Sequence, residues 1–166
     1  MDGIDSKEAF IEAVGMAMAA QGLPRNAGRV LGALLVADPP ERTAEELAEQ
    51  LQASRGSIST MTRLLEGVGI LARVSKPGDR RHYYRARRGG LAAATVQRVR
   101  GMRQMTDLLA QGLRLLDDAP PDSRRALEEM HDFYAYWSDE TLRFAEDYLA
   151  RIATTSSPAD AAGDED

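Results

Sequence analysis

The residues best suited to chemistry form a polar, basic run at positions 54–63. A helix that reads base edges in the major groove presents short polar side chains, which let its backbone approach, and arginines, which bond guanine or phosphate. The run supplies both kinds, and the expected DNA contacts are Arg55, Ser57, Ser59, Thr60 and Arg63. Because these are also ordinary surface residues, a solvated helix face is the alternative interpretation of the run alone.

A second basic cluster surrounds a predicted Lys-Pro-Gly-Asp turn. β-Prone residues flank this turn at 70–75 and 80–87, and that pattern predicts a β-hairpin. Arg80 and Arg81 lie near its tip, where an arginine can enter a narrow minor groove. Asp79 has the opposite charge, so we expect it to orient one guanidinium by hydrogen bonding rather than to contact DNA. Further phosphate contacts are expected from Lys76, Arg85, Arg87 and Arg88.

Charge is unevenly distributed along the chain. The formal net charge is −5, but residues 54–88 contain nine Lys and Arg against two acids. That segment therefore carries +7, and the remaining residues carry −12. A local basic patch of this kind is the electrostatic footprint of a nucleic-acid-binding surface.

The sequence offers little that supports enzyme chemistry. It contains no cysteine, which excludes disulfides, thiolate metal sites and a cysteine nucleophile. His82 and His131 are expected on different elements, without a His-Glu-x-x-His sequence or carboxylates at metal-ligand spacing. None of the glycine pairs leads into a phosphate-binding turn and helix. We therefore expect no enzyme, with no catalytic residue, metal or cofactor.

Helix signals place the polar run in a helix-turn-helix. Asp5 with Glu8 and Thr43 with Glu46 have the spacing of capping boxes, and Ser54 is a good N-cap. With the apolar spacing, they predict helices at 6–20, 24–37, from Thr43 onward, and at 54–66. The last two are short and adjacent, as in a helix-turn-helix, and the hairpin that follows is its wing. The buried face of the last helix is expected to hold Ile58, Met61, Thr62 and Leu65.

Two long helices are predicted after the hairpin, at 91–116 and 122–152, separated by a proline-containing break. On the second of them, five apolar side chains lie within about 60° of one another and form an aromatic stripe: Met130, Phe133, Trp137, Phe144 and Tyr148. Six of the nine aromatic residues lie between positions 133 and 148, so we expect the stripe to pack on something large.

The main interpretation of the aromatic stripe is a dimer core. Its expected partners are Phe10, Val14 and Met18 of the first helix, and Val96, Val99, Met102 and Leu109 of the long helix. The alternative is an effector pocket, in which an aromatic cage would suit a quaternary ammonium. The candidate lining residues are Phe133, Tyr134, Tyr136, Trp137 and Phe144.

The two ends of the chain favour a cytoplasmic protein without a membrane partner. The first residues are acidic where a secretory signal would be basic, and no apolar run approaches the roughly 18 residues of a membrane span. Residues 153–166 are acidic and small, without a large apolar side chain, and are expected to form a disordered tail.

Five segments, in this order, resemble the MarR superfamily and specifically its GbsR-type branch: LPRNAGRVLG at 23–32, AEELA at 44–48, SRGSIS at 54–59, RLLEGVGI at 63–70 and GDRR at 78–81. The resemblance implies homodimeric repressors in which helices outside the winged domain make the dimer and an effector often binds near the junction. The Asp-x-Arg of the family's wing maps onto Asp79 and Arg81, which implies an orienting acid and a minor-groove arginine. Arg85-Ala-Arg87 replaces the Leu-Thr that usually closes this motif.

These features predict a mainly α fold with a small β-hairpin wing (α+β), that is, a winged helix-turn-helix plus long dimerisation helices. The expected divisions are an N-terminal dimerisation helix (1–22), the DNA-binding winged domain (23–90), a helical dimerisation and effector region (91–152) and the tail (153–166). The expected function is a sequence-specific transcriptional regulator. It would bind double-stranded DNA at a pseudo-palindromic operator as a repressing homodimer, relieved by a small-molecule effector. The alternative is a winged-helix protein–protein interaction module without DNA binding. The arginine-rich wing and the small polar helix face weigh against that alternative.

Overall fold

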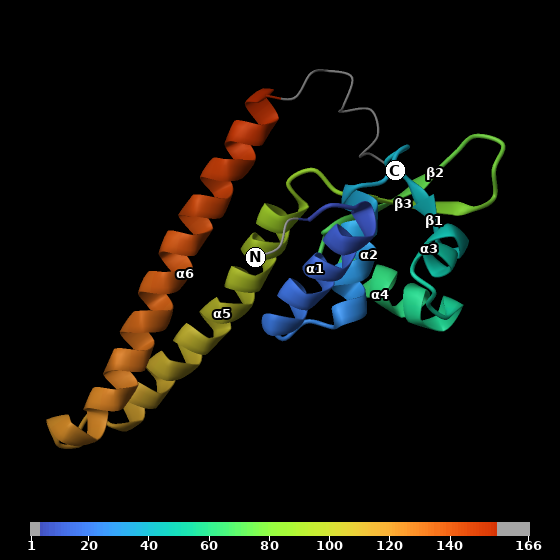
Figure 1. Ribbon diagram of the computed structural model, residues 1–166. Helices are drawn as coiled ribbons and strands as arrows, with labels where there is room; N and C mark the ends of the chain where they lie inside the picture. Colours follow the sequence, from blue (N-terminus) through green and yellow to red (C-terminus); the bar gives the residue numbers. More distant parts are fainter. Residues whose placement is uncertain (1–3, 156–166) are drawn as a thin grey trace. The chain divides into compact units, whose positions relative to one another are not determined.

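The computed structural model describes residues 4–155 and divides them into two compact units, the first ending at Gly90 and the second beginning at Leu91. The first unit contains α1 (Lys7–Ala20), α2 (Arg25–Leu35), β1 (Arg42–Thr43), α3 (Ala44–Gln50), α4 (Arg55–Gly67), β2 (Leu71–Ser75) and β3 (His82–Ala86) (Figure 1). The second contains α5 (Gly90–Leu115) and α6 (Pro121–Thr155). The mainly helical fold with a small antiparallel sheet is confirmed. Most of the predicted acidic tail lies outside the described residues.

Side-chain caps determine where the helices begin. The capping box of α3 is confirmed, because Thr43 Oγ1 accepts from the Glu46 N–H at 3.2 Å and Glu46 Oε2 accepts from the Thr43 N–H at 2.7 Å. Ser54 caps α4 as expected. The expectation for α1 was wrong, since Ser6, not Asp5, has the extended N-cap backbone, and its Oγ accepts from the Ala9 N–H at 3.0 Å.

The contact between α1 and α2 is made through glycine. A Cβ on Gly28 would lie 2.8 Å from both Gly15 Cα and Val14 O, so only glycine lets the two backbones approach this closely. The buried residues of α1 are Ile11 and Gly15. Phe10, Val14 and Met18, the apolar face expected from the sequence, are only half-buried. The sequence pattern missed this contact because glycine contributes no apolar signal to helical periodicity.

The sheet has the strand order β1-β3-β2 and is antiparallel throughout. β3 is the central strand, with Tyr83 opposite Thr43 on β1 and Val74 on β2. The two strands of the predicted hairpin are therefore confirmed, and β2 and β3 with their connecting loop are called the wing below. β1 has only two residues, too few to produce an alternating pattern, and the sequence did not predict it.

The core of the first unit holds α4 in place. Ile58, Thr62 and Leu65 of α4 are buried and Met61 is half-buried, so the predicted inner face is confirmed. The buried hydroxyl of Thr62 donates to Ile58 O at 3.0 Å, so no polar group is left unsatisfied there. The remaining core residues come from α1, α2, α3 with its C-cap, and β2: Ile11, Ala27, Val30, Ala33, Leu34, Leu47, Leu51 and Leu71.

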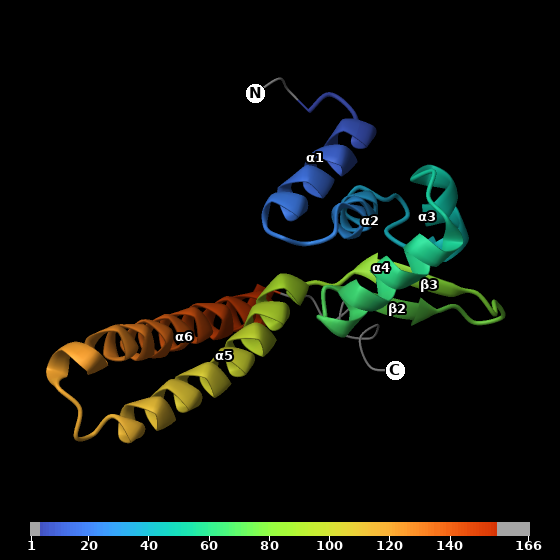
Figure 2. The same cartoon turned by 90° about the horizontal axis from the view of Figure 1, so that it is seen from below.

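In the second unit, α5 and α6 run antiparallel side by side as a helical hairpin (Figures 1 and 2). Leu127 of α6 lies against the backbone of α5 at Gly112, where a Cβ would come within 3.1 Å of its side chain. Within residues 4–155, no helix combines the length and apolar character needed to cross a membrane.

Much of the aromatic stripe on α6 is exposed. Trp137 is half-buried, whereas the exposed fractions of the other members are 52% for Met130, 63% for Phe133, 72% for Phe144 and 49% for Tyr148. The residues that α6 buries are instead Ser138 and Ala145, with Tyr134 half-buried. The stripe therefore lies to one side of the buried face of α6, as a separate apolar surface.

Candidate nucleic-acid interface

The outward face of α4 carries the five polar and basic residues expected to read DNA. Arg55, Ser59, Thr60 and Arg63 are exposed, and Ser57 is half-buried. The Thr60 hydroxyl donates to Gly56 O at 2.9 Å, which fixes its rotamer against the helix. Arg63 is exposed, and its Nε donates to Ser59 O at 3.0 Å. One helix face thus presents short polar groups between two arginines.

A side-chain network connects this face to the neighbouring helices. Asn26, near the start of α2, donates from Nδ2 to Ser57 Oγ at 3.3 Å. Arg29, one turn later, donates from Nη2 to Leu51 O at 3.0 Å, at the end of α3. Contacts from α2 therefore reach both helices of the helix-turn-helix. Sequence reasoning missed Asn26 and Arg29, because nothing in their spacing reveals partners that lie 22 to 31 residues away.

Glu12 of α1 binds the two arginines on the adjacent face of α2. Its carboxylate accepts from Arg25 Nη2 at 2.7 Å and from Arg29 Nε at 2.6 Å. The hydrogen bond from Arg25, together with Arg29, lowers the pKa of the Glu12 carboxyl below its ordinary value. The carboxylate therefore stays ionised and connects α1 to Arg29, which in turn contacts the end of α3.

The wing loop is built on a tight turn. The Asp79 N–H donates to Lys76 O at 3.0 Å, and Gly78 has φ +79°, a backbone conformation that glycine adopts without strain. Pro77 precedes Gly78, as suits a turn of this kind. The turn brings Asp79, Arg80 and Arg81 to the tip of the wing.

Asp79 and Arg81 form a tight pair within the wing loop. The Arg81 N–H donates to Asp79 Oδ1 at 2.9 Å, and Arg81 Nη2 donates to Asp79 Oδ2 at 2.7 Å. Arg81 Nε also lies within 3.1 Å of both carboxylate oxygens. The side-chain hydrogen bonds from Arg81 hold the pKa of the Asp79 carboxyl well below its usual range and raise that of the guanidinium. Both groups are therefore charged at physiological pH.

Three further residues complete this cluster: Tyr83 and Glu41, which the sequence did not predict, and Lys76, which it predicted only as a phosphate contact. The Tyr83 hydroxyl donates to Asp79 Oδ2 at 2.8 Å and accepts from Arg81 Nη2 at 2.8 Å. Lys76 Nζ lies 4.1 Å from the centroid of the Tyr83 ring and 2.8 Å from Glu41 Oε2. The hydrogen bond to Asp79 raises the pKa of Tyr83, and Glu41 raises that of Lys76. The alternation of the strand indicates which face Tyr83 lies on, but not its loop partners.

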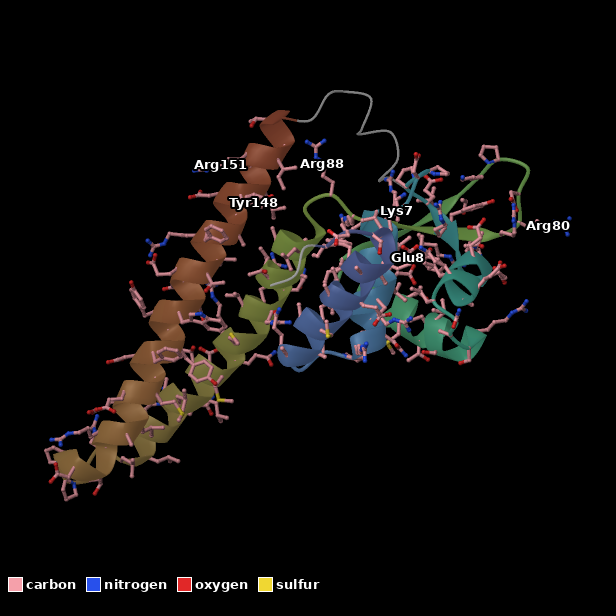
Figure 3. The ribbon with its side chains drawn as sticks, viewed as in Figure 1. Lys7, Glu8, Arg80, Arg88, Tyr148 and Arg151 are labelled. Carbon is pink, nitrogen blue, oxygen red and sulfur yellow. The ribbon has the colours of Figure 1, made fainter. Side chains whose placement is uncertain are left out.

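Arg80 and Arg85, two other predicted contacts, lie outside this cluster. Arg80 is exposed and points outward from the wing loop (Figure 3). Arg85 is half-buried further along β3, opposite Ala72 of β2. Lys76, a predicted phosphate contact, is engaged by Glu41 instead of projecting freely. No group of His, Asp or Glu within residues 4–155 has the arrangement of a metal site.

Comparisons with known proteins agree on one family. A model of the MarR family matches residues 21–82, and a model of MmpR5-like MarR family transcriptional regulators matches residues 89–151. The HTH-type transcriptional regulator MmpR5 of Mycobacterium tuberculosis (strain ATCC 25618 / H37Rv) is 45% identical over 141 residues, covering 81% of this chain and 86% of that protein. Together, the two family models span both halves of the chain.

One solved structure is about as similar to this chain in sequence as the MmpR5 protein is. The crystal structure of a transcriptional regulator superimposes with a TM-score of 0.74 at 42% identity, covering 87% of this chain and 98% of that one. The transcriptional repressor CouR, bound to a 23-mer DNA duplex, is 26% identical over 75% of this chain and 84% of that one, with a TM-score of 0.37. The MmpR5 protein and the first of these structures are transcriptional regulators, not enzymes, in agreement with the expectation from the sequence.

Proposed function

The chain belongs to the MarR family of winged-helix transcriptional regulators, and on this premise we propose that it binds operator DNA sequence-specifically through α4 and the wing. α4 would enter the major groove with Ser57, Ser59 and Thr60 toward the base edges and Arg63 on guanine or phosphate. The wing would place an arginine in the adjacent minor groove.

The observation that carries this proposal is the organisation of basic side chains in the first unit. Arg55 and Arg63 extend from an α4 whose opposite face is buried in the core. Arg81 is held at the wing tip by a carboxylate, and Arg80 is exposed beside it. Arg63 and Arg81 favour recognition of DNA over a solvated surface, because hydrogen bonds to Ser59 O and Asp79 set their directions before a ligand arrives.

We further propose that the protein acts as a homodimer, paired through the second unit. The exposed aromatic stripe on α6, with Phe133 at 63% and Phe144 at 72%, supports this, because a monomer would leave these rings in water. A two-fold dimer would present two α4 helices to two half-sites and predicts a pseudo-palindromic operator. In this account the protein is a cytoplasmic repressor.

Relief by a small-molecule effector is the regulatory part of the proposal. The same α6 region supplies the candidate ligand contacts, including Trp137, which is half-buried. The GbsR-type assignment made from the sequence motifs stays a prediction, since the matched model describes MmpR5-like regulators.

Selection of duplexes from a random-site library by the full chain tests the proposal. We expect enrichment of a pseudo-palindrome with half-sites one helical turn, or a small multiple of it, apart. Absence of any enriched sequence would contradict DNA recognition and would favour the alternative, a winged-helix module that binds another protein.

A further inference from the structure

Tyr83 connects the wing loop to the most rigid part of the sheet. It lies on the central strand β3, paired with Thr43 on one side and Val74 on the other, and only 7% of its surface is exposed. A residue held between two neighbouring strands has little freedom to move. Its hydroxyl can therefore serve as a fixed point for the loop.

The Tyr83 hydroxyl binds both members of the charged pair at the wing tip. It donates to Asp79 Oδ2 and accepts from Arg81 Nη2, each at 2.8 Å. Asp79 and Arg81 both belong to the loop between β2 and β3, so their contacts with each other leave the pair free to move with that loop. The hydroxyl removes this freedom, because it ties the pair to the sheet.

The Tyr83 ring is itself held by the start of the loop. Lys76 Nζ lies over the ring, 4.1 Å from its centroid, and also pairs with Glu41 Oε2 at 2.8 Å. A cation over an aromatic face is attracted by the ring's negative potential. Glu41 immediately precedes β1 and Lys76 immediately follows β2, so their ion pair connects the two outer strands of the sheet beside the Tyr83 ring. Lys76 therefore helps to hold Tyr83 in place beside the charged pair.

We propose that Tyr83 is a positioning residue for DNA recognition, acting through its hydroxyl to fix the direction of Arg81 before DNA binds; this rests on the proposed function. Arg81 Nε and Nη2 are engaged by Asp79 and Tyr83, whereas Nη1 makes no hydrogen bond to either of them. Nη1 is the nitrogen left to meet the groove. Ordering this long side chain in advance reduces the entropy lost on binding.

The test compares Tyr83→Phe with Tyr84→Phe on the duplex selected by the unaltered protein. Tyr84 is the next residue on β3, packs toward the core on the opposite face of the strand, and makes no hydrogen bond through its hydroxyl among the described contacts. Losing one hydrogen bond that organises a binding group should weaken affinity about three- to tenfold for Tyr83→Phe. Tyr84→Phe should change affinity less than about twofold, because it removes a hydroxyl that orients neither Asp79 nor Arg81.

A double-mutant cycle separates positioning from a general structural role. If Tyr83 acts through Arg81, adding Tyr83→Phe to Arg81→Ala should weaken binding by less than about a further twofold. In the free protein, the Arg81 Nε–H resonance should shift and exchange faster with water in Tyr83→Phe, and stay unchanged in Tyr84→Phe.

Three results would overturn the inference. Unchanged affinity in Tyr83→Phe would show that the hydroxyl is not used in binding. A full additional loss in the Arg81→Ala background would show that it acts elsewhere in the fold. Failure of the unaltered protein to select any duplex would overturn the proposed function, and this inference with it; the first two results would leave the proposed function standing.

Discussion

At the scale of single residues, the charged groups of the first unit are used mainly in pairs that direct one another. Asp79 holds Arg81 at the wing tip, and Glu12 holds Arg25 and Arg29 behind α4. An acid within hydrogen-bonding distance of a guanidinium restricts it to one orientation, which favours directional recognition over simple attraction to phosphate. Within the basic patch counted from the sequence, Arg81 is thus an oriented group and not only a positive charge.

The Glu12 pair makes a pH-dependent contribution to stability. Because hydrogen bonding from Arg25 lowers the pKa of Glu12 below its ordinary value of 4.5, the ionised carboxylate stabilises the fold above that pH. This contribution is lost as the pH falls through the lowered value. We expect Glu12→Gln to reduce the free energy of unfolding by about 1 kcal/mol at neutral pH, a figure that allows for solvent screening of a partly exposed pair.

Urea denaturation at neutral pH and at low pH measures the difference in unfolding free energy between Glu12→Gln and the unaltered protein. The gap between Glu12→Gln and the unaltered protein should narrow as the pH falls below 4.5. Glu49→Gln, on an exposed glutamate of α3, is the control and should leave stability nearly unchanged at both pH values. If Glu12→Gln lost the same amount of stability at both pH values, the ion pair would not be the cause of that loss.

At the scale of elements, the close backbone contact between α1 and α2 leaves no room for a side chain at Gly28. A Cβ on Gly28 would meet two backbone atoms at 2.8 Å, and backbone cannot move aside as a flexible side chain can. We expect Gly28→Ala to destabilise the protein by about 1–3 kcal/mol, as overpacking does. Gly101 of α5 has open space around it, so Gly101→Ala should stabilise by about 0.5–1 kcal/mol through helix propensity.

Thermal unfolding measures both variants. Although each adds one methyl group to a glycine, we expect Gly28→Ala to lower the melting temperature and Gly101→Ala to raise it. A stabilised Gly28→Ala would mean that α1 and α2 lie further apart than this structure places them. The lower stability of Gly28→Ala should also appear as a lower midpoint of urea denaturation. The dependence of the unfolding free energy on urea concentration should change little, since the folded state stays compact.

Local rules predicted much of this architecture from the sequence. The Thr43–Glu46 capping box and the Ser54 cap predicted where α3 and α4 begin, because those hydrogen bonds span three residues. The contacts of Tyr83 and Asn26 were not predicted, because they depend on how distant elements pack. The Gly28 contact was missed for a different reason, since a missing side chain carries no hydrophobic signal.

At the scale of the whole molecule, the chain has a basic, polar surface in one unit and an exposed aromatic stripe in the other. A single winged domain would contact one half-site, whereas a pair would bind two, and linked contacts raise affinity without adding new ones. In the proposed dimer, pairing through the stripe would therefore raise the affinity of the protein for an operator with two half-sites.

Introducing a charge into the stripe tests this pairing. We expect Phe144→Glu to convert a dimer into a monomer in sedimentation experiments, because burying an unpaired carboxylate in an apolar interface is strongly unfavourable. Ala150→Glu, also exposed on α6 but outside the stripe, should leave the dimer intact. A monomeric unaltered protein, or a dimeric Phe144→Glu, would place the interface elsewhere.

The most direct test of the account is the affinity of the full chain for its selected duplex across a salt series, measured by fluorescence anisotropy. If about 8 phosphates are neutralised per dimer, log affinity should fall with log salt at a slope near −7. Arg63→Ala should weaken binding about tenfold or more, whereas Arg143→Ala, an exposed arginine of α6, should not. Binding that is independent of salt, or equally strong in Arg63→Ala, would contradict DNA recognition through α4.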